Sequence, residues 1–271
     1  MRITAKIRSK DGIHVYRAEL DGVPVILKEF DNIADRREIS NYKLLATLSI
    51  PTLPMLYCTE NSLMLPDITK CDKLRPGCAQ DLEDAQTARN IARWYKALHS
   101  KGREYLATNP IDLFDETDAI TLGNMSQIAA KTGTAGNPLW QNIRRQFANI
   151  RQKIDTLPRT LTYNDFYWTN LVVARNGKSA MMLDFNLMGK GYAYGDIRNV
   201  TSSMTGDAKA AFLEEYGQTE DEAAADRVIS PLYALHIACE REIFPSWAQE
   251  DLSAVKNGKL LEYLTAWIGK N

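Results

Sequence analysis

The sequence predicts a two-lobed α+β fold, with a small antiparallel β-sheet lobe that carries one helix and a larger, mainly α-helical lobe. The first observation is a series of short strand-like runs separated by the turn signals Asp11-Gly12 and Asp21-Gly22. The second is that apolar residues recur at helical spacing after about residue 81. We therefore expect an N-terminal lobe at residues 1–67 and a C-terminal lobe at residues 68–271.

Composition favours a globular protein without a nucleic-acid or membrane partner. The 271 residues include 33 basic and 34 acidic side chains, so no overall field attracts nucleic acid or an anionic membrane. No run of about 18 apolar residues occurs, and the first ten residues lack the apolar segment of a secretory signal. The four cysteines form no Cys-x-x-Cys pair and are expected to be reduced thiols. We expect a cytoplasmic protein, and its oligomeric state is left open.

The N-terminal lobe is expected to contain five strands around one helix. Lys28 follows the apolar run Val25-Ile26-Leu27 on the third strand, and Glu38 lies in the first turns of a helix expected from about residue 34 to 48. Taken alone, Lys28 is typical of a solvated strand residue, and Glu38 is an acid favoured near a helix N-terminus. The strands are expected at residues 3–7, 14–20, 24–30, 55–58 and 63–68.

The C-terminal lobe is expected to be helical on both sides of one hairpin. Asp81 is the expected N-cap of a helix that Gly102 would end. The acids of residues 214–242 are interpreted either as solvated helix faces or as groups that attract a cationic substrate. Four aromatic residues are either core residues or a cation–π enclosure: Tyr233, Trp247, Tyr263 and Trp267. Further helices are expected at residues 115–131, 138–155, 207–216, 223–241 and 253–268.

The hairpin follows a loop with a distinctive spacing of polar residues. Asp165 and Asn170 are separated as Asp-x-x-x-x-Asn, and the apolar runs 171–174 and 180–183 flank the turn signal Asn176-Gly177. Because strands of nearly equal length return the chain to its starting end, the second strand should bring Asp184 back beside Asn170. Oxygen ligands for a hard divalent cation then converge, as at a Mg²⁺ site that also binds phosphates.

These residues resemble the phosphotransferase motif of the aminoglycoside phosphotransferase and choline kinase-like family, which has a protein kinase-like fold. The family pattern is usually His-Gly-Asp-x-His-x-x-Asn, followed by an apolar strand and Ile-Asp-Trp/Phe. Asp165, Asn170 and Asp184 match the pattern. Three other residues depart from it, because Tyr163, Asn164 and Tyr167 stand where the family commonly has His, Gly and His.

The resemblance implies an ATP-dependent transfer of the γ-phosphate to a hydroxyl of a small molecule, such as an amino sugar, an aminoglycoside or a choline-like alcohol. In this interpretation Asp165 orients the acceptor hydroxyl, and Asn170 and Asp184 hold Mg²⁺. Lys28 binds the nucleotide phosphates and pairs with Glu38. At the hinge between the lobes, the carbonyl of Pro66 and the N–H of Ile68 are expected to bind the adenine ring.

The resemblance also implies supporting roles. His99 is expected to pack beneath the catalytic loop, and Asp196 either braces that loop or caps the helix that follows it. The interval from Asp184 to Asp196 is short and no Ala-Pro-Glu follows, which disfavours a protein substrate. Two alternatives to a small-molecule kinase stay open: a nucleotide-binding regulatory pseudokinase without turnover, which Asn164 and Tyr167 motivate, and a protein kinase.

Overall fold

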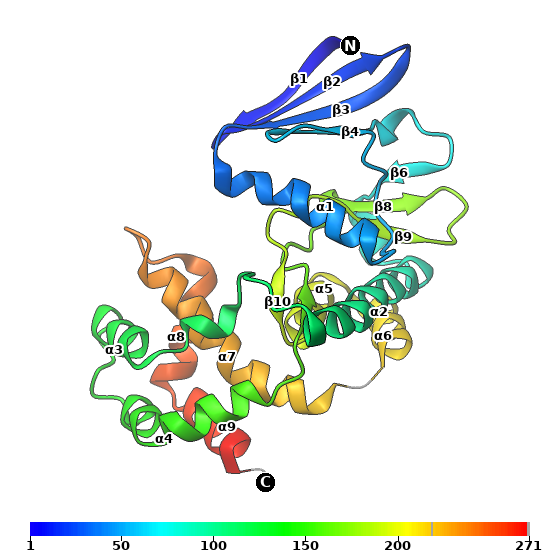
Figure 1. The fold of residues 1–271 in the computed structure, drawn as a ribbon. Helices are drawn as coiled ribbons and strands as arrows, with labels where there is room; N and C mark the ends of the chain where they lie inside the picture. Colours follow the sequence, from blue (N-terminus) through cyan, green and yellow to red (C-terminus); the bar gives the residue numbers. More distant parts are fainter. Residues whose placement is uncertain (218, 270–271) are drawn as a thin grey trace. The chain divides into compact units, whose positions relative to one another are not determined.

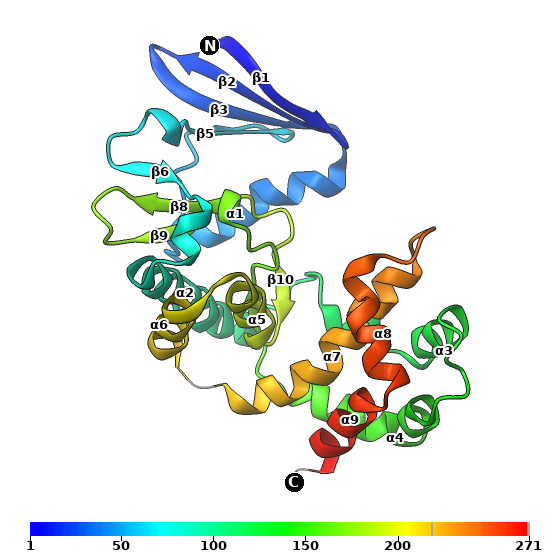
Figure 2. The same cartoon turned by 180° about the vertical axis from the view of Figure 1, so that it is seen from behind.

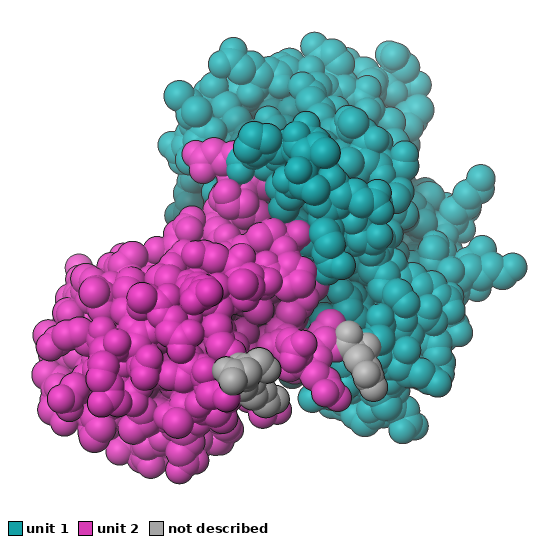
Figure 3. Space-filling model, turned by 60° about the horizontal axis from the view of Figure 1, so that its bottom comes forward, with its two compact units in different colours: residues 1–111, 160–189, 196–218 teal, residues 112–159, 190–195, 219–271 magenta. Residues whose placement is uncertain are grey.

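The computed structural model describes residues 1–217 and 219–269, which cluster into two compact units (Figure 3). Unit 1 comprises residues 1–111, 160–189 and 196–218. Unit 2 comprises residues 112–159, 190–195 and 219–271. The boundary predicted between residues 67 and 68 falls inside unit 1, so the division into those two lobes stays a prediction.

A five-stranded antiparallel sheet begins unit 1, with the order β1-β2-β3-β5-β4. Figure 1 labels β1 to β4 of this sheet, and β5 is labelled in the reverse view of Figure 2. Its first two turns use positive φ angles at Asp11 and Gly12 (54° and 79°) and at Asp21 and Gly22 (51° and 83°), as two-residue hairpin turns require. The strands are β1 (Arg2–Lys10), β2 (Ile13–Leu20), β3 (Val23–Phe30), β4 (Tyr57–Cys58) and β5 (Ser62–Pro66). The predicted meander is therefore confirmed.

One helix, α1 (Arg37–Thr47), follows β3 after a short 3₁₀ turn at Ile33–Arg36. Its buried face carries the apolar residues Ile39, Tyr42 and Leu45, as the spacing predicted. The same face also buries two polar side chains, Glu38 and Asn41.

The rest of unit 1 combines a three-stranded sheet, ordered β6-β8-β9, with helices (Figure 2). In the hairpin, Leu171 lies opposite Met182 and Val173 opposite Ala180. Helix α2 packs against both β7 and α6. The elements are β6 (Leu74–Pro76), α2 (Ala85–Thr108), β7 (Thr160–Thr162), β8 (Leu171–Ala174), β9 (Ala180–Met182) and α6 (Gly206–Tyr216). Two elements cross a unit boundary along the chain, β10 (Gly189–Gly191) and α5 (Tyr194–Ser203).

The turn of this hairpin differs from the predicted two-residue turn. Ala174 N–H bonds the carbonyl of Ser179 at 3.0 Å, so four residues form the loop. Gly177 has a φ of 70°, whereas Asn176 stays at negative φ and its side chain accepts the Lys178 N–H at 3.0 Å. Asn176 thus stabilises the loop through its side chain rather than through a left-handed backbone.

Helix α2 corrects two predictions about its ends. Its N-cap is Asp84, which accepts the Thr87 N–H at 2.6 Å, whereas Asp81 lies inside a preceding 3₁₀ turn, Ala79–Leu82, and accepts the N–H of its N-cap, Cys78. The helix also continues through Gly102 to Thr108. A Cβ on Gly102 would lie 2.7 Å from the backbone nitrogen of Leu161, so glycine permits close packing of α2 on β7 and does not end the helix.

Unit 2 is helical around one apolar core. Its core residues include Ile128, Leu139, Leu235 and Leu264, each with an exposed fraction of 0%. The segment predicted as one helix at residues 115–131 forms a 3₁₀ turn and then α3, because Thr121 caps the second helix through the Asn124 N–H. The helices are α3 (Leu122–Lys131), α4 (Pro138–Asp155), α7 (Glu220–Cys239), α8 (Gln249–Lys256) and α9 (Lys259–Gly269), with 3₁₀ turns η4 (Glu116–Ala119) and η6 (Ser246–Ala248).

Within residues 1–217 and 219–269, every helix is too short or too polar to cross a bilayer.

Candidate active site

Lys28 and Glu38 form a buried ion pair in unit 1. The Lys28 Nζ lies 2.8 and 2.6 Å from the two carboxylate oxygens of Glu38. It also donates to Oδ1 of Asp184 at 3.2 Å. The exposed fractions are 8% for Lys28 and 0% for Glu38. Strand β3, helix α1 and the end of the hairpin thus bring together three predicted site residues.

Burial and charge act in opposite directions on this pair. Burial alone would lower the pKa of Lys28, but the carboxylates of Glu38 and Asp184 outweigh it and raise that pKa above its ordinary value. Burial raises the pKa of Glu38 to about 7, and the Lys28 ammonium lowers it only in part. The proton shared by this pair therefore resides on Lys28.

The catalytic-loop candidates Asp165 and Asn170 bond each other directly. Asn170 Nδ2 donates to Oδ2 of Asp165 at 2.9 Å and to its backbone carbonyl at 3.1 Å. Burial raises the pKa of Asp165, the nearby Asp184 carboxylate raises it further, and Asn170 and Lys28 oppose these effects only partly. Asp165 is therefore a stronger base than an ordinary solvated aspartate.

The hairpin returns Asp184 to Asn170, as its strand lengths predicted. The Leu183 N–H bonds the carbonyl of Asn170 at 2.9 Å, so Asp184 begins next to the end of the loop. Asp184 itself has a φ of 64°, a left-handed conformation that costs most non-glycine residues about 1–2 kcal/mol. Its side chain is 28% exposed, so it remains accessible while Lys28 holds one of its oxygens.

Asp196 and His99 form a hydrogen-bonded support for the start of the loop at Tyr163 and Asn164. The Asp196 carboxylate accepts the N–H groups of Tyr163 and Asn164 at 2.8 and 2.9 Å. His99 Nε2 lies 3.0 Å from the same carboxylate, and His99 Nδ1 lies 2.7 Å from the Tyr216 hydroxyl. Both side chains are buried and joined to loop backbone, which agrees with the bracing role predicted for Asp196 and the packing role predicted for His99.

The three departures from the family pattern have separate structural explanations. Asn164 has a φ of 65°, which glycine adopts freely and asparagine tolerates better than most residues. Tyr163 is fully buried, and its hydroxyl donates to the carbonyl of Leu183 at 2.5 Å. Tyr167 is 64% exposed and is the N-cap of the 3₁₀ turn Trp168–Asn170.

The donor set at Asn170 and Asp184 suits Mg²⁺. A carboxylate and an amide oxygen are hard ligands, and Asn170 uses its Nδ2 on Asp165, which leaves its oxygen to ligate. Among the residues that the structure describes, no three His, Cys, Asp or Glu side chains gather as a metal site. Two protein oxygen ligands fit a cation that takes its other ligands from phosphate and water, as Mg²⁺ commonly does.

The predicted hinge lies at the end of β5. Asp67 N–H bonds the carbonyl of Pro24, and Leu56 N–H bonds that of Met64. Because successive residues of a strand direct their polar groups to opposite sides, the carbonyl of Pro66 is directed away from β3. Ile68 begins a 3₁₀ turn capped by Asp67, so its N–H is one of the groups that such a turn leaves unused.

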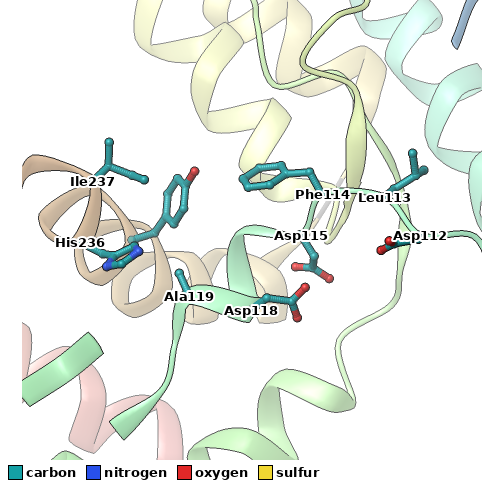
Figure 4. A pocket seen from close by; sticks show the side chains of 9 residues that line it. Asp112, Leu113, Phe114, Asp115, Asp118, Ala119, His236 and Ile237 are labelled. Atoms are coloured by element: carbon teal, nitrogen blue, oxygen red, sulfur yellow. The ribbon is translucent and has the colours of Figure 1, made fainter. Parts of the chain in front are cut away.

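Unit 2 contains a pocket with a volume of about 360 Å³ (Figure 4). Phe114 and Tyr233 lie on it with ring centroids 6.1 Å apart. Asp112 and Asp118 are exposed at this pocket, whereas Asp115 is buried and bonds Arg159 at 2.8 Å. The lining residues come from the segment before η4, from η4 itself and from α7: Asp112, Leu113, Phe114, Asp115, Asp118, Ala119, Tyr233, His236 and Ile237.

The acids of residues 214–242 are neither one solvated face nor one site. Glu214 and Glu215 pair with Arg89 and Arg93 of α2 at 3.4 and 2.9 Å. Glu222 and Asp226 are buried on α7, where they accept hydrogen bonds from the Tyr194 N–H and the Tyr192 hydroxyl.

The four aromatic residues considered as a cation–π enclosure lie in different surroundings. Trp267 is a core residue, and Tyr263 packs against that core beside Arg227 and Lys259. Trp247 is 54% exposed, and Tyr233 lies at the pocket.

Sequence reasoning missed two polar side chains near Asp184. Asn41 donates to the carbonyl of Phe185 at 2.7 Å, and the Tyr163 hydroxyl donates to that of Leu183. The available signal was a polar residue on the apolar face of α1, three positions after Glu38.

Comparisons with known proteins support the fold. No protein-family model matches the chain, and no curated protein matches its sequence. The macrolide 2′-phosphotransferase MphH of Brachybacterium faecium has 16% identity and a TM-score of 0.58, and the match covers 93% of this chain and 91% of that one. The choline kinase LicA of Streptococcus pneumoniae has 11% identity and a TM-score of 0.61, with 97% and 95% covered.

A third solved structure, spectinomycin phosphotransferase APH(9)-Ia in complex with ADP and spectinomycin, has 12% identity and a TM-score of 0.55, with 94% and 89% covered. At these identities the likeness shows the fold. The chain thus has the fold of macrolide, choline and aminoglycoside phosphotransferases, and the predicted class, a small antiparallel sheet followed by a mainly helical region, is confirmed.

Proposed function

We propose that this protein is an ATP-dependent phosphotransferase that moves the γ-phosphate to a hydroxyl of a small molecule. The observation that carries the proposal is the convergence of Lys28, Glu38 and Asp184 in unit 1, beside the hydrogen-bonded pair Asp165 and Asn170. Five side chains from four separate segments have the chemistry that phosphoryl transfer needs, which is positioning and charge stabilisation. Neighbours of the same fold bind AMP or ADP, which supports a nucleotide site.

Each residue has a role that its surroundings favour. Lys28, fixed by Glu38, is positioned to bind the phosphates that are not transferred. Asp165 accepts a hydrogen bond from the acceptor hydroxyl and takes its proton, and its raised pKa makes it better suited to that task. Asn170 and Asp184 hold Mg²⁺, which when bound neutralises charge on the phosphates. Burial of Lys28 and Glu38 lowers the local dielectric, so the ammonium acts more strongly than it would in water.

At the hinge, we propose that the carbonyl of Pro66 and the N–H of Ile68 bind adenine. The strand register that directs the Pro66 carbonyl away from β3 supports this assignment. The proposed lobes at residues 1–67 and 68–271 would then meet at this segment.

The pocket in unit 2 is a candidate binding site for a small molecule, and its lining suggests which compounds to include in a screen. Exposed Asp112 and Asp118 beside Phe114 and Tyr233 favour a molecule that carries both an ammonium and a hydroxyl group. Neighbours named for choline and spectinomycin, both of which combine these groups, point to the same class of acceptor.

The test is a screen for acceptor-dependent ADP release with ATP and Mg²⁺, using amino sugars, aminoglycosides, choline-like alcohols and neutral polyols. We expect release with at least one amine-bearing alcohol, and mass spectrometry should show the acceptor gain one phosphate. Incorporation of label from ATP into proteins of a lysate, with no small acceptor used, would instead identify a protein kinase.

The alternative function, a nucleotide-binding regulatory protein without turnover, predicts a different result in the same acceptor screen. It requires ATP binding in calorimetry without ADP release for any acceptor. The argument for this alternative is that Asn164 and Tyr167 depart from the family pattern. The φ of 65° at Asn164 weakens the argument, because asparagine accommodates this conformation.

A further inference from the structure

The backbone at Asp184 is in a conformation that its neighbours must hold. Its φ of 64° is left-handed, and aspartate adopts such angles more readily than most residues but less readily than glycine. A residue in this region persists where surrounding contacts over-determine it, and such residues gather at functional sites. The contacts at Leu183 and Phe185 therefore decide where the Asp184 carboxylate lies.

The two residues that flank Asp184 in sequence each have a backbone carbonyl that accepts a hydrogen bond from a buried side chain. The Tyr163 hydroxyl donates to the Leu183 carbonyl at 2.5 Å, and Asn41 Nδ2 donates to the Phe185 carbonyl at 2.7 Å. The exposed fractions of the two donors are 0% for Tyr163 and 4% for Asn41. The Phe185 carbonyl also accepts the Met188 N–H at 3.3 Å, so Asn41 supplies the shorter of its two bonds. Loss of either side-chain donor therefore removes the shortest bond that holds the carbonyl.

One face of helix α1 contacts Phe185, the residue after Asp184, through three neighbouring side chains. Glu38, Asn41 and Tyr42 are three and four residues apart, which places them side by side on the helix. Glu38 accepts the Phe185 N–H, Asn41 bonds its carbonyl, and the Tyr42 ring packs edge-on against the Phe185 ring at 4.8 Å and 81°. Glu38 also holds Lys28, so one helix face positions both the cation and the backbone beside Asp184.

We propose that Asn41 and Tyr163 are positioning residues that fix the Asp184 carboxylate for its divalent cation. The inference rests on the proposed function, because it assumes that Asp184 binds Mg²⁺ with the nucleotide. Without the Tyr163 hydroxyl the Leu183 carbonyl loses its side-chain donor, and without Asn41 the Phe185 carbonyl keeps only the longer bond from the Met188 N–H. In either case the left-handed turn is held less firmly. The carboxylate then spends less time in the arrangement that a cation requires, so more Mg²⁺ is needed to reach the same occupancy.

The test uses the full chain with Asn41→Leu and Tyr163→Phe, each with a matched control. Asn90→Leu removes another buried asparagine, which donates to the carbonyl of Gly177 at 2.9 Å on the β8–β9 turn. Tyr95→Phe removes another buried tyrosine hydroxyl, which lacks a hydrogen-bond partner among the described residues. Asn90→Leu matches the loss of a bonded amide, and Tyr95→Phe matches the removal of a buried hydroxyl without breaking a hydrogen bond. Both controls leave the Asp184 contacts intact.

Three measurements are made on each variant: the Mg²⁺ concentration that gives half-maximal enhancement of ATP binding, amide exchange of a peptide spanning residues 183–186 without nucleotide, and the melting temperature. We expect Asn41→Leu and Tyr163→Phe to need about tenfold more Mg²⁺ and to exchange faster in this peptide. The controls should stay within about twofold of wild type in both, even where their melting temperatures fall equally.

Two outcomes overturn the inference in distinguishable ways. If both variants keep the wild-type Mg²⁺ requirement and exchange rate, Asn41 and Tyr163 contribute only to stability, and the proposed function is untouched. If the wild-type chain binds ATP equally well with and without Mg²⁺, the proposed function fails and the inference fails with it.

Discussion

The acids of unit 1 and the acids at the unit 2 pocket differ in burial and in what holds them. Glu38 is fully buried and bonds Lys28 through both oxygens, and Asp184 has one oxygen on the same ammonium. Asp112 and Asp118 are exposed at the edge of a pocket that also carries aromatic rings. The first group is fixed before any ligand arrives, whereas the second group is solvated.

This difference in burial determines how strongly each group of acids can interact with a bound ligand. Charges in a buried, hydrogen-bonded network interact through a low effective dielectric and do not reorganise when a ligand binds. Exposed carboxylates are screened by water and salt, and pairs at such positions contribute at most about 1 kcal/mol. We therefore expect substitutions in unit 1 to change the chemical step and substitutions at the pocket to change acceptor affinity modestly.

The largest effect is expected at the catalytic loop and the hairpin end. Asp165→Asn and Asp184→Asn should each lower turnover by at least about 10³-fold, since the first removes the base and the second a metal ligand. Steady-state ADP release measures this, with thermal unfolding as the check on folding. Asp21→Asn is the control, because Asp21 is an exposed aspartate with a φ of 51°, which asparagine also tolerates. Wild-type turnover by either site variant would refute the assignment.

The next effect concerns Asp81, a buried acid of unit 1 that does not belong to the group of Lys28, Glu38 and Asp184. Arg75 binds both oxygens of Asp81 at 2.7 and 2.6 Å, and the Cys78 N–H donates at 2.8 Å. Burial alone would raise the pKa of Asp81, but these bonds outweigh it and lower that pKa below its ordinary value. Because the folded-state pKa lies below the unfolded one, the stabilisation is complete above the unfolded pKa and is lost as pH falls through the folded pKa.

Asp81→Asn should therefore lower the free energy of unfolding by about 2 kcal/mol at pH 7, and the difference from wild type should shrink below about pH 4. Urea denaturation at several pH values measures it. Glu83→Gln, at an exposed neighbouring position, should change stability by less than about 0.5 kcal/mol. A difference that stays constant from pH 7 to pH 3 would contradict the ionic explanation.

A smaller effect on stability is expected when a helical glycine is replaced by alanine, and it should differ between the two units. Gly102→Ala should destabilise the protein by about 1–2 kcal/mol, since the added Cβ would lie 2.7 Å from Leu161 N and 2.8 Å from Thr160 Oγ1. Gly123→Ala on α3 should be neutral or stabilise by about 0.5 kcal/mol, because the nearest atom is 3.8 Å away and alanine favours helices. Thermal unfolding of both variants decides it, and a stabilising Gly102→Ala would show that α2 does not pack closely on β7.

The smallest effect is expected at the unit 2 pocket. Asp112→Asn with Asp118→Asn should raise KM for an amine-bearing alcohol about fivefold, with kcat nearly unchanged, because exposed carboxylates attract the ammonium weakly. The effect should shrink in 0.5 M salt, roughly, since screening weakens exposed charges. KM for a neutral alcohol is the control. An unchanged KM for the amine would exclude these acids from acceptor binding, and a large loss of kcat would remove the contrast between the two units.

Predictions from sequence succeeded where the interaction is local in the chain. Asp165 and Asn170 are five residues apart, and the hairpin strands that bring back Asp184 are nearly equal in length, so spacing alone placed these residues together. Lys28 and Glu38 were placed by resemblance to a known motif, and their buried ion pair agrees with it. The catalytic and metal-binding roles of these residues remain predictions.

Local signals misled where two elements pack closely. Glycine commonly ends helices, so Gly102 was predicted to end this one. The residue is glycine because Leu161, far along the chain, approaches the helix closely there. Asp81 and Asp84 both have the side chain of an N-cap, and only the path of the chain assigned the first to a 3₁₀ turn and the second to α2.

The sequence by itself determined the meander of strands, the hairpin and the convergence of Asp165, Asn170 and Asp184, because turn residues and strand lengths act over a few positions. Only the tertiary structure decided which buried donors meet the carbonyls beside Asp184 and which acids surround the unit 2 pocket. Asn41 and Phe185 are far apart in sequence, as are Asp118 and Tyr233. Such contacts depend on the packing of whole elements, and no local periodicity specifies them.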